Sequence, residues 1–361
     1  MRGRETKQSS MLCLMSPEER VPADHPLRRI KKTTDTVLER LSPVFDDMYA
    51  ATGRSSVPPE RLLKSMLLMA LYSVRSERMF CEQLNYNLLF RWFLDMDMVE
   101  EAFDATTFTH NRERLLKHDV AGEFFGAVVR EAKRKDLMST DHFSVDGTLI
   151  EAWASMKSFR PKDEKDDDDK PDGNGWQDFS GKPRSNETHE CKTDPEAKLM
   201  RKGKGKPAVL CFSGHAMMEN RNGLLVDFRI ADASPREEVN VALAMLDERS
   251  PRSRLVTVAA DRAYDVKRFV EESRVLGATP HVVQLRKRRS NVDERTTRHP
   301  GYAISLRCRM RIEEIFGWMK TAGNFRRSRW RGIAKTQLAA SMVAAAYNLL
   351  RMSKLLAAEG T

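Results

Sequence analysis

Cysteine is scarce in this chain of 361 residues, which has five: Cys13, Cys81, Cys191, Cys211 and Cys308. They are scattered, no pair stands at the spacing of a zinc site, and an odd total cannot form a closed set of disulfides. The sequence therefore argues against zinc sites and against a disulfide framework. We expect reduced thiols in a cytosol.

A long apolar run is also missing. The stretch Ser65–Val74 falls short of the roughly 20 residues that a membrane helix needs, and Thr336–Leu350 is rich in small residues. The N-terminus opens with charged residues and has no apolar core of the signal-peptide kind. These absences predict a cytoplasmic protein with no membrane partner.

Charge is plentiful and unbalanced. Charged residues make up 32% of the chain, the net charge is +10 and the pI is near 9.4. Such an excess suits a polyanion, because each Lys or Arg placed on a phosphate releases condensed counterions. A basic protein that is merely soluble has the same composition, so the clustering of the charges must decide. The length allows two domains or one large one.

The first part of the chain, from Pro26 to about Leu137, is dense in helix signals. Apolar residues recur three and four apart, and the segment after Pro58 and Pro59 is apolar nearly all round, which predicts a buried central helix. The stretch Asp104–Lys117 is typical of a DNA-recognition helix, with Thr106 or Thr107 as the N-cap, but an ordinary solvated helix has the same pattern. We expect an all-helical domain over residues 1–138.

A strand-rich part begins at His142. The strand-like alternation of side chains in this segment ends on Asp146, which Gly147 follows. This pattern predicts a strand that leads into a tight turn. Residues 157–206 are strongly polar, with an acidic run and a basic run, and are typical of an inserted, partly disordered loop.

The remaining elements alternate. We expect strands over 208–213, 224–230, 255–260 and 281–284, and helices over 235–248, 266–276 and 302–320. With the first strand, this order predicts an α/β domain over residues 139–361, a mixed five-stranded sheet with helices packed on it. Ligand sites in such sheets lie at the carboxyl ends of strands.

Acidic residues stand at the ends of two of these strands, Asp146 and Asp261. A third carboxylate from the last helix would complete a site of hard oxygen ligands for Mg²⁺. Two such ions about 3.5 to 4 Å apart can activate an attacking oxygen and stabilise a leaving one in phosphodiester chemistry. Each residue alone also has a structural explanation: a turn, a helix cap and a solvated helical pair.

The helix offers two neighbouring glutamates, Glu313 and Glu314, which face different directions because a helix turns about 100° per residue. Glu313 shares its stripe with Arg309 and Lys320, whereas Glu314 lies apart from them. A separate stripe is apolar and is expected to face the core: Ile304, Cys308, Ile312, Ile315 and Met319. We therefore expect Glu313 to be the metal ligand and the two cations to hold DNA phosphates.

Several segments resemble the DDE transposases of bacterial insertion sequences, specifically the family numbered five. The resemblance extends over nearly the whole chain and is carried by DGTLIEAWAS, AADRAYD, RCRMRIEEIFGWMK, the helical segment from VPPERLLK onward and the final AAAYNLLRM. It implies an RNase H-like fold, two Mg²⁺ ions for which Mn²⁺ can substitute, and binding to the element's terminal inverted repeats. It also implies cutting and rejoining of double-stranded DNA by a homodimer in a synaptic complex, on the bacterial nucleoid.

The family's helix signature places a tyrosine three residues before the arginine, and this chain has Leu306 there. The arginine, glutamate and lysine of the signature are present as Arg309, Glu313 and Lys320. The departure therefore concerns an auxiliary contact and leaves the metal ligand and both cations in place.

Two basic clusters could form the DNA surface. One is Arg286–Arg289, and the other contains Arg326, Arg327, Arg329, Trp330, Arg331 and Lys335. Arginines around an aromatic ring suit an unpaired base as much as a duplex backbone. His215 is expected near the turn of the hairpin as a hydrogen-bonded structural residue, Arg221 and Asn222 belong to the same turn signal, and all three are left out of the site.

Two other functions fit the same residues. A nuclease of this fold would cut DNA without strand transfer, and an inactive derivative would bind DNA only. Loss of one of the three carboxylates would favour the inactive derivative, and all three are present. Strand-transfer products would separate a transposase from a nuclease.

Overall fold

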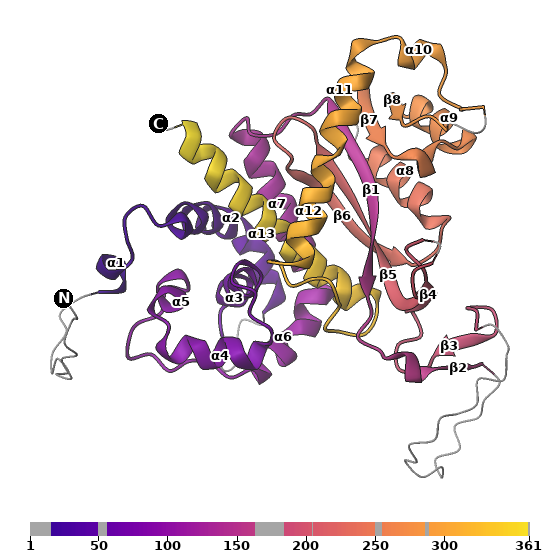
Figure 1. Ribbon diagram of the computed structural model, residues 1–361. Helices are drawn as coiled ribbons and strands as arrows, with labels where there is room; N and C mark the ends of the chain where they lie inside the picture. The colour runs from indigo at the N-terminus through magenta and orange to yellow at the C-terminus, as the bar shows by residue number, and fades with distance from the viewer. Residues whose placement is uncertain are drawn as a thin grey trace, which may run out of the picture.

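The described residues of the N-terminal part, up to Arg134, form helices and no strand (Figure 1). The computed structural model describes residues 16–49, 56–162, 184–203, 205–249, 255–285 and 289–359. The first helices are α1 (Pro17–Arg20), α2 (Pro26–Met48), α3 (Pro59–Leu71), α4 (Glu77–Tyr86), α5 (Leu88–Phe93), α6 (Thr106–Lys117) and α7 (Val120–Arg134).

The interior of this helical region centres on α3, as the apolar run predicts. Leu62, Leu63, Leu67 and Leu68 are each 0% exposed. Burial of four leucines on several sides of one helix requires neighbours all round, and α2 and α13 supply them. The prediction of a buried central helix is confirmed.

Helix α6 begins as expected, but with a different cap. The backbone N–H of its first residue, Thr106, donates to Asp104 Oδ1 at 2.7 Å. The expected cap at Thr106 or Thr107 is therefore wrong. Its basic residues turn inward: Arg112 pairs with Glu77 at 2.5 Å, and Arg114 lies 4.5 Å from the ring centre of Tyr49. These contacts favour the structural interpretation of this helix over a recognition helix.

The sheet has the strand order β4-β5-β1-β7-β8, with β6 also paired to β5. Its strands are β1 (His142–Glu151), β4 (Lys198–Met200), β5 (Val209–Glu219), β6 (Leu225–Asp232), β7 (Val256–Ala260) and β8 (Ala278–Val282). Strands β5 and β6 are antiparallel to their neighbours, whereas β7 and β8 run parallel to β1. This is the RNase H-like arrangement expected from the sequence, with β4 as an additional strand.

The polar segment 157–206 is partly folded. It contains η1 (Met156–Ser158) at its start, and β2 (Phe159–Pro161) pairs with β3 (His189–Cys191). Strand β4 joins the main sheet against Val209–Cys211 of β5. The expectation of a loop is therefore wrong for these parts, because backbone pairing with distant segments orders a sequence of low hydrophobicity. The acidic run at 166–169 lies outside the described residues.

Helices cover both faces of the sheet (Figure 1). They are α8 (Glu237–Arg249), α9 (Lys267–Val275), α10 (Glu294–Thr297), α11 (Pro300–Arg309), α12 (Arg311–Lys320) and α13 (Ile333–Glu359), with η2 (Arg262–Tyr264) after β7. Helix α8 packs on β5, β6 and β1, and α11 and α12 also pack on β1.

The expected single helix over 302–320 is two helices that meet at Met310, which keeps nearly helical dihedrals of −56° and −24°. Within α12 the predicted core stripe is confirmed at Ile312, Ile315 and Met319. It is wrong at Ile304, which is 52% exposed. Helix α11 instead turns Ser305 toward the sheet, where its Oγ lies 2.8 Å from His281 Nδ1.

The last helix, α13, joins the two parts of the protein. It packs on β6 of the sheet and on α2, α3 and α7 of the helical region. Asn348 fixes it to β6, because its side chain accepts from Leu225 N at 2.9 Å and donates to Leu225 O at 2.8 Å. Among the helices of the described ranges, none is both long and apolar enough to cross a membrane.

Candidate active site

Asp146 lies in the middle of β1, not at its end. The antiparallel pairing with β5 continues from Phe143 to Glu151 without a break, and Gly147 stands opposite His215. The predicted tight turn after Asp146 is therefore wrong. Local sequence suggested a turn because glycine weakens a strand, but pairing along the whole of β5 keeps this segment extended.

Asp261 meets Asp146 through the register of two parallel strands. Thr257, Val258 and Ala259 of β7 lie beside His142, Phe143 and Ser144 of β1. The pairing stops there, and Asp146 and Asp261 each follow two residues later, close enough that repulsion from Asp261 raises the pKa of Asp146. The Asp261 side chain also accepts from Ala263 N at 2.7 Å, so it caps η2 as well.

The edge of β1 that faces β7 becomes free at this point. Its pairing with β7 ends at Ser144, and the next backbone pairing on β1 apart from β5 is between Glu151 and Arg327, as far as the described residues extend. Side chains from both faces of the sheet can therefore converge around residues 145–150 of β1. We call this stretch the open edge of β1.

Helices α11 and α12 bring the expected cations to one face of the open edge. Arg309 Nη1 lies 3.5 Å from Asp146 Oδ2, and Lys320 Nζ donates to Thr148 Oγ1 at 2.5 Å. Asp146 and Thr148 are two residues apart and share a face of the strand. Arg309 and Lys320, at the two ends of the predicted stripe, therefore both contact this face of β1.

The two neighbouring glutamates have different surroundings. Glu313 is one of the charges that raise the pKa of Asp146, whereas Glu314 acts on Tyr347 of α13. Both side chains are exposed. Glu313 thus acts electrostatically on Asp146 and Glu314 on a residue of α13, while the choice of Glu313 as the metal ligand stays a prediction.

Burial and like charge set the electrostatics of Asp146. Burial raises its pKa to about 6, and repulsion from Asp261 adds to the rise, while the Gly147 amide and Arg309 act in the opposite sense. Within the described ranges no three His, Cys, Asp or Glu side chains lie close enough together to hold a metal ion. The oxygens nevertheless have the hard-ligand chemistry that divalent cations prefer, and a cation would relieve their mutual repulsion.

Arg309 is poorly satisfied by the protein. Its side chain is 12% exposed, its contact with Asp146 is long, and its buried Nε has no hydrogen-bond partner. A buried donor without a partner is costly, so this guanidinium has capacity left for an anion. Lys320 lies nearby with its pKa lowered to about 8 by burial and by Lys202 and Arg326.

Sequence reasoning missed two residues at this site. Glu238 of α8 has its pKa raised to about 7, first by burial and then by Asp261 and Asp146. Tyr264, 1% exposed, follows Asp261 in η2 and is influenced by Glu238, Asp146 and Asp261. Glu238 sits in an ordinary amphipathic helix start and Tyr264 in a loop, so neither carried a local signal.

The basic segment after α12 is divided between surface and interior. Arg326 and Arg331 are exposed. Arg327 is also exposed, but its guanidinium donates to the carbonyls of Ala152 and Trp153 and lies 5.8 Å from the centre of the Trp153 ring. Arg326 and Arg331 are thus exposed, whereas the exposed Arg327 already has partners in the protein.

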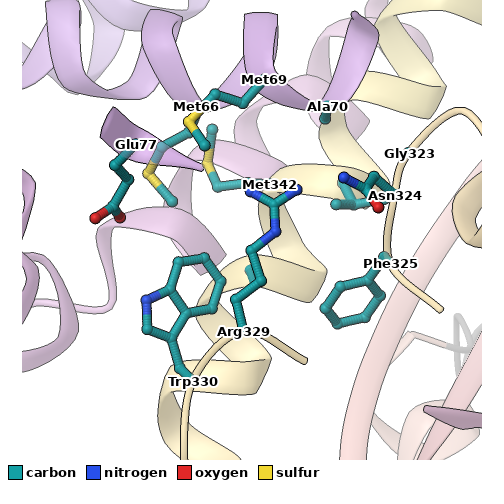
Figure 2. Close-up of a pocket in the computed structure, with 12 residues that line it drawn as sticks. Met66, Met69, Ala70, Glu77, Gly323, Asn324, Phe325, Arg329, Trp330 and Met342 are labelled. Atoms are coloured by element: carbon teal, nitrogen blue, oxygen red, sulfur yellow. The ribbon is translucent and has the colours of Figure 1, made fainter. Parts of the chain in front are cut away.

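Arg329 and Trp330 point into a small pocket between α3 and α13, of about 50 Å³ (Figure 2). Arg329 donates to Val74 O at 3.0 Å, and Arg112 lies 5.3 Å from the centre of the Trp330 ring. Both residues therefore tie the catalytic part to the helical region. In the other basic cluster, residues 286–288 lie outside the described residues.

His215 is a buried, hydrogen-bonded residue as expected, with Nε2 2.9 Å from Ser213 Oγ. It lies in the middle of β5, however, and not near the hairpin turn. The turn itself is organised by Glu219, which is 0% exposed and accepts from the amides of Arg221 and Asn222 at 2.9 and 2.8 Å. The assignment of Arg221 and Asn222 to a turn is confirmed.

Comparison with family models gives two matches along the chain. Residues 15–114 match a transposase domain, DUF772, and residues 177–349 match the transposase DDE domain. The second match includes Asp261 and Glu313, and Asp146 lies before it. A search of curated proteins gives no match.

Among solved structures, the chain is similar to three transposase complexes at low identity. The piggyBac transposase synaptic complex with hairpin DNA shares 11% identity at a TM-score of 0.43, covering 93% of this chain and 76% of that one. A pre-cleavage Mos1 transpososome shares 11% at 0.21, covering 93% and 89%. The Mos1 strand transfer complex shares 10% at 0.20, covering 87% and 90%.

Proposed function

Since the chain is a DDE transposase, a phosphoryl-transfer enzyme built from a transposase domain and a transposase DDE domain, we propose that its catalytic carboxylates are Asp146, Asp261 and Glu313. The observation that carries this proposal is the repulsion between Asp261 and Asp146, which lie just beyond the paired segments of β7 and β1, at the start of the open edge. The proximity of Glu313 to Asp146 supports the third assignment. The element moved is proposed to be an insertion sequence of the family numbered five, bound at its terminal inverted repeats.

The reaction would proceed by two displacements at phosphorus. Water attacks a phosphodiester at the element's end, a P–O bond to water forms, and the bond to the 3′ oxygen breaks to leave a 3′-hydroxyl. That hydroxyl then attacks a target phosphodiester, so that a new 3′ O–P bond forms and the target strand leaves with its own 3′-hydroxyl. A carboxylate near the attacking oxygen can accept its proton in each step.

Asp146, Asp261 and Glu313 would hold two Mg²⁺ ions, and Mn²⁺ can take the same oxygen ligands. When bound, these cations supply stabilisation of charge on the attacking and leaving oxygens. The chain's own contribution is to fix the ligands: Asp146 within the pairing of β1 and β5, and Asp261 by its capping bond to Ala263 N.

Arg309 and Lys320 are proposed to hold the phosphates next to the scissile bond. Both lie on the face of β1 that carries Asp146, and the unpartnered Nε of Arg309 supports an anion contact there. The exposed Arg326, Arg327 and Arg331 would extend this contact along the DNA backbone, which sets salt-dependent affinity and not sequence choice. The contacts of Arg329 and Trp330 support an indirect role in DNA binding, through the packing of the two domains.

The helical region, residues 1–138, is proposed to bind the terminal repeats, and residues 139–361 to carry the catalysis. Two ends must be brought together before they are joined, so a homodimer in the synaptic complex is proposed.

Cleavage and joining of labelled DNA with the element's own ends tests these assignments. Asp146→Ala, Asp261→Ala and Glu313→Ala should bind DNA and be inert in Mg²⁺, while Glu314→Ala keeps activity. Activity in the Glu313 variant together with an inert Glu314 variant would reverse the helical-face assignment. Cutting without joining would indicate a nuclease, and binding without cutting an inactive derivative.

A further inference from the structure

A fourth carboxylate approaches the open edge of β1 from the side opposite α12. Glu238 Oε1 lies 2.6 Å from the position that a Cβ atom on residue 147 would take. Residue 147 is glycine, and it directly follows Asp146. A glycine inside a strand commonly marks the close approach of another group, and here that group is the Glu238 carboxylate.

The Glu238 side chain is unusual among the acids of α8. Glu237 accepts from Asn240 Nδ2 at 3.2 Å, and Glu248 pairs with Arg229 at 2.6 Å. No hydrogen bond or ion pair to the Glu238 carboxylate is found among the described residues, although the side chain is half-buried. A partly desolvated carboxylate without a partner destabilises the fold, so its position calls for a ligand that neutralises it.

The neighbours of Glu238 are themselves acidic. Asp261 and Asp146 both act on it by charge repulsion, and Glu238 in turn acts on the buried Tyr264 beside Asp261. Pairing of β1 with β7 stops at Ser144. Within the described part of the chain, no neighbouring strand therefore covers this edge of β1 at residues 145–147. Carboxylates from opposite faces can therefore meet around this edge.

We infer that Glu238 is a fourth metal-binding carboxylate of the catalytic centre, which would bind a divalent cation with Asp146 and Asp261 once these side chains, too far apart here to hold an ion, draw together at the open edge of β1. The inference rests on the proposed function of that centre. Hard divalent cations accept six or more oxygen ligands, so an additional carboxylate adds to the set without displacing another. Glu313 lies on the opposite face, which would place the cation between α8 and α12.

Titration of the full-length protein with Mn²⁺ alone, followed by electron paramagnetic resonance of the free ion, tests this inference. Glu238→Gln should weaken Mn²⁺ binding by at least about tenfold. Glu237→Gln, one residue away and turned to Asn240, is the matched control and should bind as the native protein does. Circular dichroism of each variant under the conditions of the titration checks that it is folded.

A second variant, Gly147→Ala, keeps the Glu238 carboxylate but displaces it. Gly147→Ala places a methyl group where the carboxylate lies, and the carboxylate, at the end of a flexible side chain, must shift. It should weaken Mn²⁺ binding in the same direction as Glu238→Gln. If both variants bind Mn²⁺ like the native protein while Asp146→Asn does not, Glu238 is no ligand and the proposed centre stands. If Asp146→Asn and Asp261→Asn also bind normally, the proposed centre itself is wrong.

Discussion

Neutralising Asp146 should stabilise the metal-free protein at high pH while removing its activity. Burial and Asp261 raise the pKa of Asp146 from 3.8 to about 6, and its side chain is 16% exposed. The folded state therefore holds the proton more tightly than the unfolded state, so stability falls as the pH rises from about 4 to about 6 and the full penalty remains above pH 6.

The size of the effect follows from the shift. Each pKa unit corresponds to about 1.4 kcal/mol, so the carboxylate costs about 3 kcal/mol at pH 8. An unfolding entropy of about 2.1 cal/mol/K per residue over the whole chain converts this to a rise in Tm of about 4 °C for Asp146→Asn. At pH 4 the folded carboxyl is almost fully protonated and the unfolded one about 40% protonated, so most of the penalty is absent and the difference should fall to about 1 °C or less.

Differential scanning fluorimetry in the presence of a chelator, at pH 4 and pH 8, measures both values. Asp232→Asn removes an exposed carboxylate of β6 and should change Tm little at either pH. Mn²⁺ at about ten times its dissociation constant should then stabilise the native protein by about 1.4 kcal/mol and leave Asp146→Asn unchanged. A gain in Tm that is absent at pH 8, or equal at both pH values, would refute the account of Asp146 as a desolvated, repelled carboxylate.

Three further outcomes are expected. Glu219→Gln should destabilise the protein by about 2 to 4 kcal/mol in urea unfolding, because the carboxylate accepts four backbone amides and a neutral amide has a single acceptor oxygen; an unchanged midpoint would contradict this. Arg329→Met keeps the apolar stem but loses the hydrogen bond to Val74 O, so it should lower the free energy of unfolding by about 1 kcal/mol and increase hydrogen exchange in α3. Weaker DNA binding at an unchanged Tm would instead indicate that Arg329 contacts DNA directly. Arg309→Met should reduce the slope of log affinity against log salt by about 1 for DNA carrying the element's ends, and an unchanged slope would exclude a phosphate contact.

The sequence alone predicted the order of most elements, apart from β2, β3 and β4 in the polar segment and the division of the helix over 302–320 into α11 and α12. Hydrophobic period, prolines and turn residues are local signals, so the buried α3, the hairpin of β5 and β6, and the alternation of strands and helices after it followed from short windows. Asp146, Asp261 and Glu313 were selected as candidates in the same way, from strand ends, a helical stripe and a family resemblance. The choice of Glu313 over Glu314 rests on helical geometry, which is also local, and stays a prediction.

Tertiary structure decided the rest, because strand pairing and burial depend on segments far apart in the chain. Pairing with β5 made Asp146 a mid-strand residue, and the parallel pairing of β1 with β7 brought Asp261 near it. The same long-range contacts placed Glu238 against Gly147, a proximity that no spacing in the sequence encodes. They also turned Arg329, in a basic run that looked like a DNA surface, toward the backbone of Val74, since the side chain's environment is fixed by the docking of the helical region.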